Sequence, residues 1–256
     1  MIARAGAITL LLGAALAQIA GTQAVLAAEP AATPYRPTLS NPAELSAPGY
    51  LELEAGWQRE TGGGERRAAL PWLAKYAFSE DFGVLLGGEA AVWLRDPAGV
   101  RRNGQGDMSL TLKFHRALAE TSALGLEVGA RLDTAANGLG GGRSDYTING
   151  IYSGDFGPLR GDLNLGVTRL GSTAAGEGRD EAAWALALSR NLGGPWGAAV
   201  ELSGTARRNA RPTSLFLAAV SYAVSPTLVL DFGAATALTR VGPDLGLFLG
   251  FTWLPR

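Results

Sequence analysis

The 256-residue chain contains no cysteine, one histidine and two lysines, and its formal net charge is only −1. The absence of cysteine excludes disulfide bonds, thiol catalysis and zinc–thiolate sites together. The near-neutral charge gives no general electrostatic attraction for nucleic acid. Beyond the N-terminal region, apolar runs such as 215–220 and 245–251 are far short of the roughly 20 residues that a transmembrane helix needs. If the chain crosses a membrane, it must therefore do so as a closed β-barrel.

Residues 106–133, GDMSLTLKFHRALAETSALGLEVGARLD, show what the chain has instead. Apolar residues occupy every second position from Met108 to Phe114, and polar residues lie between them. The alternation resumes after a short polar turn and continues to Asp133. A period of two predicts two β-strands, each with one apolar and one polar face.

The same period continues through the chain from residue 49 onward, and no convincing helical period interrupts it. The turns near 78–81 and 118–122 are short, whereas the segments near 95–105 and 134–144 are longer and rich in Gly and Arg. Twelve strands are predicted, at 49–59, 66–77, 82–94, 106–116, 123–133, 145–153, 159–169, 181–190, 196–206, 213–223, 227–238 and 245–254. The other short turns are expected near 154–158, 191–195 and 224–226, and the other longer loops near 60–65, 170–180 and 207–212; the last connection, at 239–244, is intermediate in length.

Short turns at one end and long loops at the other are typical of outer-membrane barrels. The polar face carries glycine and single charges, and aromatic residues gather near the strand ends, as expected of two membrane interfaces. A basic residue on the lipid face near mid-membrane costs about 2–4 kcal/mol, and the alternation keeps Lys113 and Arg131 off that face. We therefore predict an all-β fold, a 12-stranded antiparallel transmembrane β-barrel at 49–256 in the bacterial outer membrane. The strands at 82–94 and 213–223 alternate less cleanly, and the two faces of 215–220 cannot be assigned.

The N-terminus shows a positive residue, Arg4, then an apolar run over 7–17 and small residues up to Ala28. This order predicts a secretory signal peptide at 1–28. A membrane anchor is the alternative, but polar residues interrupt the run before it reaches a spanning length. Residues 29–48 are rich in Pro, Ala, Thr and Ser, and we expect an irregular N-terminal lead on the periplasmic side, because an even strand number leaves both termini there.

Three segments resemble one family, the outer-membrane β-barrel "transporter" proteins related to the phenol meta-pathway degradation proteins. They are Leu70–Gly88, Gly104–Phe114, in which Gly104, Gly106, Asp107 and Lys113 match a Gly-x-Gly-Asp strand start followed by Lys, and Leu228–Leu238. The resemblance implies a barrel that transports small, hydrophobic or aromatic solutes. Many outer-membrane barrels end in an aromatic residue that the barrel-assembly machinery reads. Here Trp253 is followed by Leu254, Pro255 and Arg256, so Trp253 would serve from an inner position or the signal is weak.

The inward charges are the candidate lining of a solute passage. We expect Lys113, Glu127 and Arg131 to face one another on one hairpin. Glu52, Glu54 and Asp231 are expected nearby, with the two glutamates close to Thr252 where the first and last strands meet. Two interpretations stay open: a polar passage whose rings of charge select solutes, or ion pairs that fill a narrow barrel.

Arginines concentrate in or beside the predicted longer loops. Solubility with local acidic partners is the simplest interpretation. Two sharper hypotheses are contact with lipopolysaccharide phosphates, which suit the guanidinium fork, and steering of anionic solutes. The residues nominated for such contacts are Arg101, Arg102, Arg207 and Arg208. Lipid, lipopolysaccharide, a small solute and the assembly machinery are thus the expected partners, and no cofactor, metal or nucleic acid is expected.

Two other functions stay open besides a passive channel. One is an outer-membrane lipid-modifying enzyme with His115 as general base, but the sequence nominates no nucleophile beside it, and a lumen or interface residue is the better reading. The glycine-rich stretch 138–145 lacks the Lys and the helix of a phosphate-binding loop and is predicted to be a hairpin loop. The other function is a structural barrel with a sealed lumen.

Overall fold

The computed structural model describes residues 29–136 and 138–255. The predicted signal peptide, 1–28, lies outside the described residues. No helix in the described part of the chain is long and apolar enough to cross a membrane. The strands, all within the unit Ala31–Arg256, are β1 (Leu51–Gly62), β2 (Glu65–Ala77), β3 (Phe82–Arg95), β4 (Arg101–Gly104), β5 (Met108–Ala119), β6 (Ser122–Leu132), β7 (Asp145–Phe156), β8 (Leu159–Arg169), β9 (Asp180–Gly193), β10 (Trp196–Arg207), β11 (Thr213–Ser225), β12 (Leu228–Ala237) and β13 (Leu245–Trp253).

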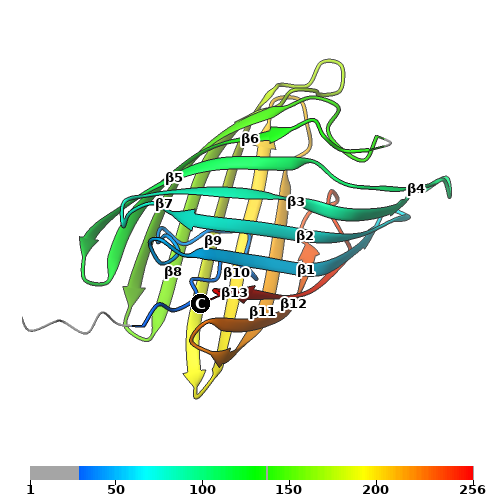
Figure 1. Ribbon diagram of the computed structural model, residues 1–256. Coiled ribbons are helices and arrows are strands. Elements are labelled where there is room, and N and C mark those ends of the chain that lie inside the picture. The colour runs from blue at the N-terminus through cyan, green and yellow to red at the C-terminus, as the bar shows by residue number, and fades with distance from the viewer. Residues whose placement is uncertain (1–28, 137, 256) are drawn as a thin grey trace, which may run out of the picture. The chain divides into compact units, whose positions relative to one another are not determined.

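The strands form one closed antiparallel barrel (Figure 1). Consecutive strands pair with each other except for β4 and β5, and β1 pairs with β13, which closes the sheet. β4 and β5 both pair with β3: β5 with its N-terminal part, 82–87, and β4 with its C-terminal part, 92–95. They therefore occupy one position in the barrel wall. The predicted 12-stranded barrel is confirmed, and Glu54 pairs with Thr252 at the closure, as expected.

The connection between β1 and β2 differs from the prediction of a longer loop at 60–65. Glu60, Thr61 and Gly62 continue the ladder with β2, so the turn consists of two residues only, Gly63 and Gly64. Both have positive φ angles, 57° and 85°, as a type I′ hairpin turn requires. The flanking residues are polar, which hid their strand character in the sequence.

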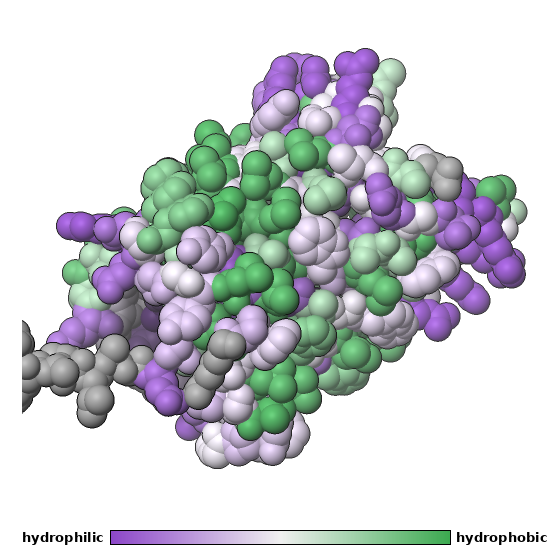
Figure 2. All heavy atoms as spheres, viewed as in Figure 1, coloured by the Kyte–Doolittle hydropathy of each residue, from purple (hydrophilic) through white to green (hydrophobic). Residues whose placement is uncertain are grey.

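Side chains of opposite character cover the two surfaces of the wall. On β6, for example, Leu124, Leu126 and Val128 are exposed whereas Glu127 between them is buried. Apolar residues cover much of the barrel's outer wall and polar residues gather toward its ends (Figure 2). The interior is the polar side, as predicted: Lys75, Lys113 and Glu52 are among the largest fully buried side chains.

The two strands with unclear alternation have different explanations. In β3 the register slips between the pairs Ala69–Val92 and Pro71–Glu89, so β3 holds one extra residue there. Such a bulge inverts the face of every later side chain. In β11, Leu217 and Ala219 are buried inside while Phe216 and Val220 are exposed outside. This strand alternates regularly, but small or apolar residues occupy its inner face.

Candidate functional site

Residues 31–48, which have no helix or regular strand, run inside the barrel and contact its wall from β1 around to β12 (Figure 1). The sequence predicted an irregular periplasmic lead for residues 29–48 and did not predict that this segment enters the lumen. Its backbone N–H groups donate to inward carboxylates: Thr33 to Glu52 Oε2 at 2.9 Å and Tyr35 to Glu54 Oε1 at 2.7 Å. The charged face of the wall thus supplies the hydrogen bonds that the segment cannot form with itself.

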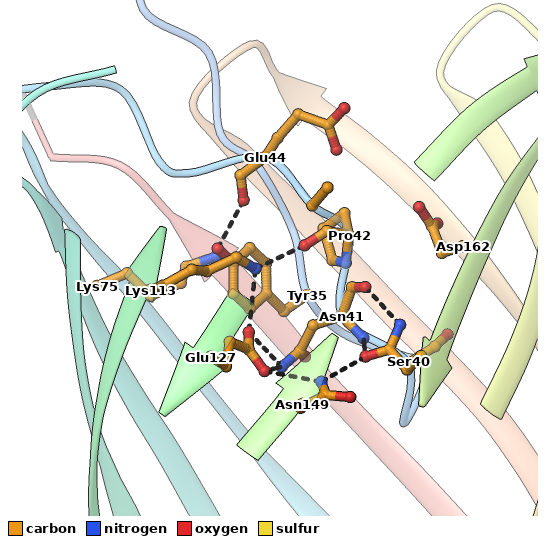
Figure 3. Close-up of polar contacts among 12 residues, drawn as sticks. Tyr35, Ser40, Asn41, Pro42, Glu44, Lys75, Lys113, Glu127, Asn149 and Asp162 are labelled. Carbon is orange, nitrogen blue, oxygen red and sulfur yellow. Dashed lines mark hydrogen bonds and ion pairs between the residues drawn. The ribbon is translucent and has the colours of Figure 1, made fainter. Parts of the chain in front are cut away.

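Tyr35 is the central side chain of the segment and is only 3% exposed. The ammonium groups of Lys75 and Lys113 lie 3.9 and 4.1 Å from the centre of its ring, which makes two cation–π contacts (Figure 3). Its hydroxyl donates to the carbonyl oxygen of Glu44 at 2.8 Å. Burial, and then the carboxylates led by Glu127, raise the pKa of Tyr35 well above its ordinary value, so the hydroxyl stays a donor.

Each of the two lysines is also held by carboxylate and backbone oxygens. Lys75 Nζ lies 2.5 Å from an oxygen of Glu52 and from one of Glu54, and it donates to Thr33 O at 2.6 Å. Lys113 Nζ lies 3.1 Å from Glu127 Oε1 and donates to Pro42 O at 2.5 Å. The only two lysines of the chain therefore fasten the segment to β2 and β5.

Arg36 extends from the segment across the β1–β13 closure to β12. It donates to both carboxylate oxygens of Asp231, at 3.0 and 3.1 Å. Its guanidinium lies where side chains of Gly56 and Gly250 would stand, because a Cβ atom on either glycine would approach Arg36 to 2.8 and 2.5 Å. Glycine on the inner face of β1 and β13 is thus required for the close approach.

The middle of the segment is held by amide and hydroxyl groups. Ser40 donates from both its N–H and its Oγ to Glu201 Oε2 at 2.8 Å. Asn41 exchanges hydrogen bonds with Asn164 and donates its side-chain amide to Glu127 (Figure 3). The partners of Ser40 and Asn41, which are Glu201, Asn164 and Glu127, are all buried residues of the inner wall.

Two cavities adjoin the segment. One of 520 Å³ lies near the short turns and is lined by Arg36, Thr38 and Ala187, among others. The other, of 270 Å³, lies toward the longer loops and is lined by Leu39, Ala185 and hydroxyl-bearing side chains of Thr147, Thr168 and Thr205. Ala185 and Ala187 are neighbours on the inner face of β9, so the cavities meet the segment at adjacent levels. Thr38 lines the larger cavity and the next residue, Leu39, lines the smaller one, so the segment separates the two cavities at this point.

Five of the six proposed lumen residues form hydrogen bonds with the segment: Glu52, Glu54, Lys113, Glu127 and Asp231. Lys113 and Glu127 form the expected cross-strand pair on the β5–β6 hairpin. Arg131 does not join them. It lies four residues further along β6 and forms ion pairs with Asp107 and Asp145, and its side chain is 41% exposed.

Asp107 organises the long loop beyond β6. It accepts hydrogen bonds from the N–H groups of Thr134, Ala135 and Gly141. Burial alone would raise the pKa of Asp107, but these donors together with Arg131 lower it below the ordinary value. The Asp107–Arg131 pair therefore supports a loop at the barrel rim, away from the segment.

The four nominated arginines differ in their surroundings. Arg101 is exposed on β4, and Arg208 is exposed just beyond β10. Arg102 donates to Gly138 O at 3.1 Å, and Arg207 pairs with Glu177 at 2.8 Å. Two of the four thus already have partners within the chain.

His115 lies near the short-turn end of β5, and its Nδ1 is 2.9 Å from the carbonyl oxygen of Glu80. Within the described residues, no serine or threonine hydroxyl is hydrogen-bonded to it. The pairing of a nucleophile with a base that an acyl hydrolase needs is therefore not formed at this residue.

No protein-family model and no curated protein matches the chain. Solved structures do match its fold. An outer membrane channel from Pseudomonas putida F1 is 16% identical, with a TM-score of 0.67 over 83% of this chain and 98% of that one. The NanC porin is 7% identical, with a TM-score of 0.57 over 80% and 100%, and the KdgM porin is 9% identical, with 0.55 over 79% and 99%. The chain therefore has the fold of outer-membrane channels and porins.

Proposed function

We propose that the protein is a passive outer-membrane channel for small solutes, with residues 31–48 as its internal constriction. The observation that carries this proposal is the pair of cavities, 520 and 270 Å³, that adjoin the segment inside a closed barrel with a polar interior. The apolar outer surface fits a lipid bilayer. The closed barrel also leaves no strand edge with unpaired backbone groups exposed to lipid.

The contacts that hold the segment are mostly polar, which favours a removable constriction over a permanently packed core. Most anchors of the segment are hydrogen bonds and ion pairs, such as Arg36–Asp231 and Ser40–Glu201. The buried apolar cluster that includes a residue of the segment is small: Ala43 with Ala123 and Ile151. Water entering the lumen can replace these polar contacts one at a time, because each hydrogen bond to a charged group contributes only about 1.5–3 kcal/mol.

The solute class is proposed from the sequence resemblance to the phenol meta-pathway group, carried by Leu70–Gly88, Gly104–Phe114 and Leu228–Leu238. On this basis the solutes are small and hydrophobic or aromatic. The smaller cavity is consistent with such a solute, because Leu39 and Leu215 line it beside neutral hydroxyl groups. A hydroxyl-bearing aromatic molecule could stack against apolar surface there while its polar group is hydrogen-bonded.

Solute flux into proteoliposomes tests the channel. Vesicles containing the folded mature protein should admit small solutes such as glycine or arabinose faster than protein-free vesicles. Exclusion of all small solutes by folded protein would instead favour the sealed structural barrel.

A second experiment tests the solute class: phenol should reduce the ion current through the barrel, while glucose at the same concentration does not. Equal effects of the two would reject the aromatic preference and leave the channel itself standing.

A further inference from the structure

Four arginines lie together on the outer surface of the barrel, at the end that carries the longer loops. Arg66 on β2 is paired in register with Arg95 on β3, and Arg95 is paired with Arg101 on β4. Arg59 on β1 lies two residues nearer the barrel middle, in the row of Ala68. All four side chains are exposed. We call them the outer arginine patch.

The register places Arg66, Arg95 and Arg101 directly opposite one another on neighbouring strands, which lie about 4.7–4.9 Å apart. Like charges at such positions destabilise a sheet, and a bound anion would offset this repulsion. None of the four side chains forms an ion pair or hydrogen bond with another described residue. By contrast, Arg67, beside Arg66 but facing the lumen, pairs with Glu89 at 2.6 Å.

The nearby carboxylates do not neutralise the patch. Glu60 and Glu89 are on the lumen side, where Arg67 lies next to them. Glu65 shares the strand face of Arg67. Asp96 Oδ1 accepts the N–H of Val100 within the loop. The patch therefore presents four positive charges outward without a counter-charge from its own chain.

The position of the patch identifies its environment. Trp93 is outward-facing and 49% exposed, and it lies two residues from Arg95 toward the barrel middle. Trp57 lies likewise two residues from Arg59 on β1. Tryptophan rings of barrel proteins sit at the level of the lipid headgroups. The arginines thus stand just beyond the apolar band, at headgroup height, and they face lipid rather than the lumen.

We propose that the outer arginine patch binds the phosphate groups of lipopolysaccharide in the outer leaflet. Guanidinium groups bind phosphate through paired, charge-assisted hydrogen bonds, and adjacent arginines on β2, β3 and β4 can engage more than one phosphate of a single lipid. The patch retains Arg101 of the sequence hypothesis. It replaces Arg102 and Arg207, which have partners within the chain, and Arg208, which lies apart from the patch just beyond β10. The outward direction of its side chains also argues against the steering of anionic solutes into the lumen. The proposal rests on the proposed outer-membrane location.

Native mass spectrometry of the full mature protein in detergent tests the site, with bis-phosphorylated lipid A as the probe. The variant Arg66→Gln/Arg95→Gln/Arg101→Gln should bind lipid A more weakly by about tenfold or more. The control variant Arg208→Gln/Arg211→Gln/Arg240→Gln removes the same charge from exposed arginines elsewhere at the loop end, and its affinity should stay close to that of the wild type. Equal weakening in both variants, or no weakening in either, overturns the proposal.

Two further arms identify the ligand chemistry. Lipid A without its phosphates should bind the wild type no better than it binds the patch variant. Competition by inorganic phosphate as effective as that by lipid A would show a site for free phosphate and would overturn the lipid assignment. Solute flux is measured on the same two variants. Normal flux with unchanged lipid A binding rejects the patch alone, whereas absent flux in the folded wild type rejects the channel alone.

Discussion

Buried charge is the feature that distinguishes this lumen at the residue scale. Lys75 is completely buried and touches two carboxylates, those of Glu52 and Glu54. Its ammonium group also donates a hydrogen bond to the backbone carbonyl oxygen of Thr33. A charged group in such a place is stable only while all its partners are present, since removal of one leaves the others buried without compensation.

Substitution of Lys75 should therefore be costly. Lys75→Met leaves two buried carboxylates without their cation, and we expect the free energy of unfolding to fall by about 3–5 kcal/mol. Arg169→Gln removes a basic residue from the exposed pair with Asp180, where a loss below about 1 kcal/mol is expected. Urea titrations of both variants in lipid vesicles measure the difference, and equal losses would contradict the buried network.

At the scale of single elements, most of the barrel could be predicted because strands in a membrane wall alternate between two solvents. The β5–β6 hairpin is the clearest case, since Lys113 and Glu127 face each other as expected. β3 was predicted as a strand at 82–94, but its alternation was less clear because its bulge shifts the period midway. The turn at Gly63 and Gly64 was expected to be a longer loop because polar residues continue the ladder into it.

The segment 31–48 could not be placed from sequence because it has no period and is fixed only by contacts distant in the chain. Two indirect signals exist in hindsight. Gly56 and Gly250, which pair across the β1–β13 closure, leave room for Arg36. The inner face also carries more carboxylates than basic groups, and the N–H groups of the segment meet that excess.

The outer wall yields a depth-dependent prediction. Leu126 lies near the middle of β6 and is exposed to lipid, whereas Leu132, also exposed, ends the strand. Leu126→Arg should destabilise the folded barrel by about 2–4 kcal/mol, and Leu132→Arg by about 0–1 kcal/mol. Folding titrations into lipid vesicles check this ordering, and the reverse ordering would show that the bilayer is centred elsewhere on the barrel.

At the scale of the whole molecule, the barrel and its internal segment form one system. The wall provides a closed polar lumen, and residues 31–48 divide that lumen by contacts with β1, β2, β5, β6, β7, β8, β10 and β12. Conduction then depends on how firmly the segment is held. The absence of native cysteine allows this to be controlled, because a Cβ atom on Gly125 would lie 3.4 Å from that of Ala43, near disulfide range.

Single-channel conductance in planar bilayers tests this account most directly. The wild type is compared with Tyr35→Ala/Arg36→Ala/Asn41→Ala, which removes three anchors of the segment, and with Ala43→Cys/Gly125→Cys, which ties the segment to β6 when oxidised. We predict small steps for the wild type, larger steps for the triple variant, and steps no larger than wild type for the oxidised double-cysteine variant. Identical steps in all three, or silence from wild-type and triple-variant protein shown to be folded, would contradict a passage governed by the segment.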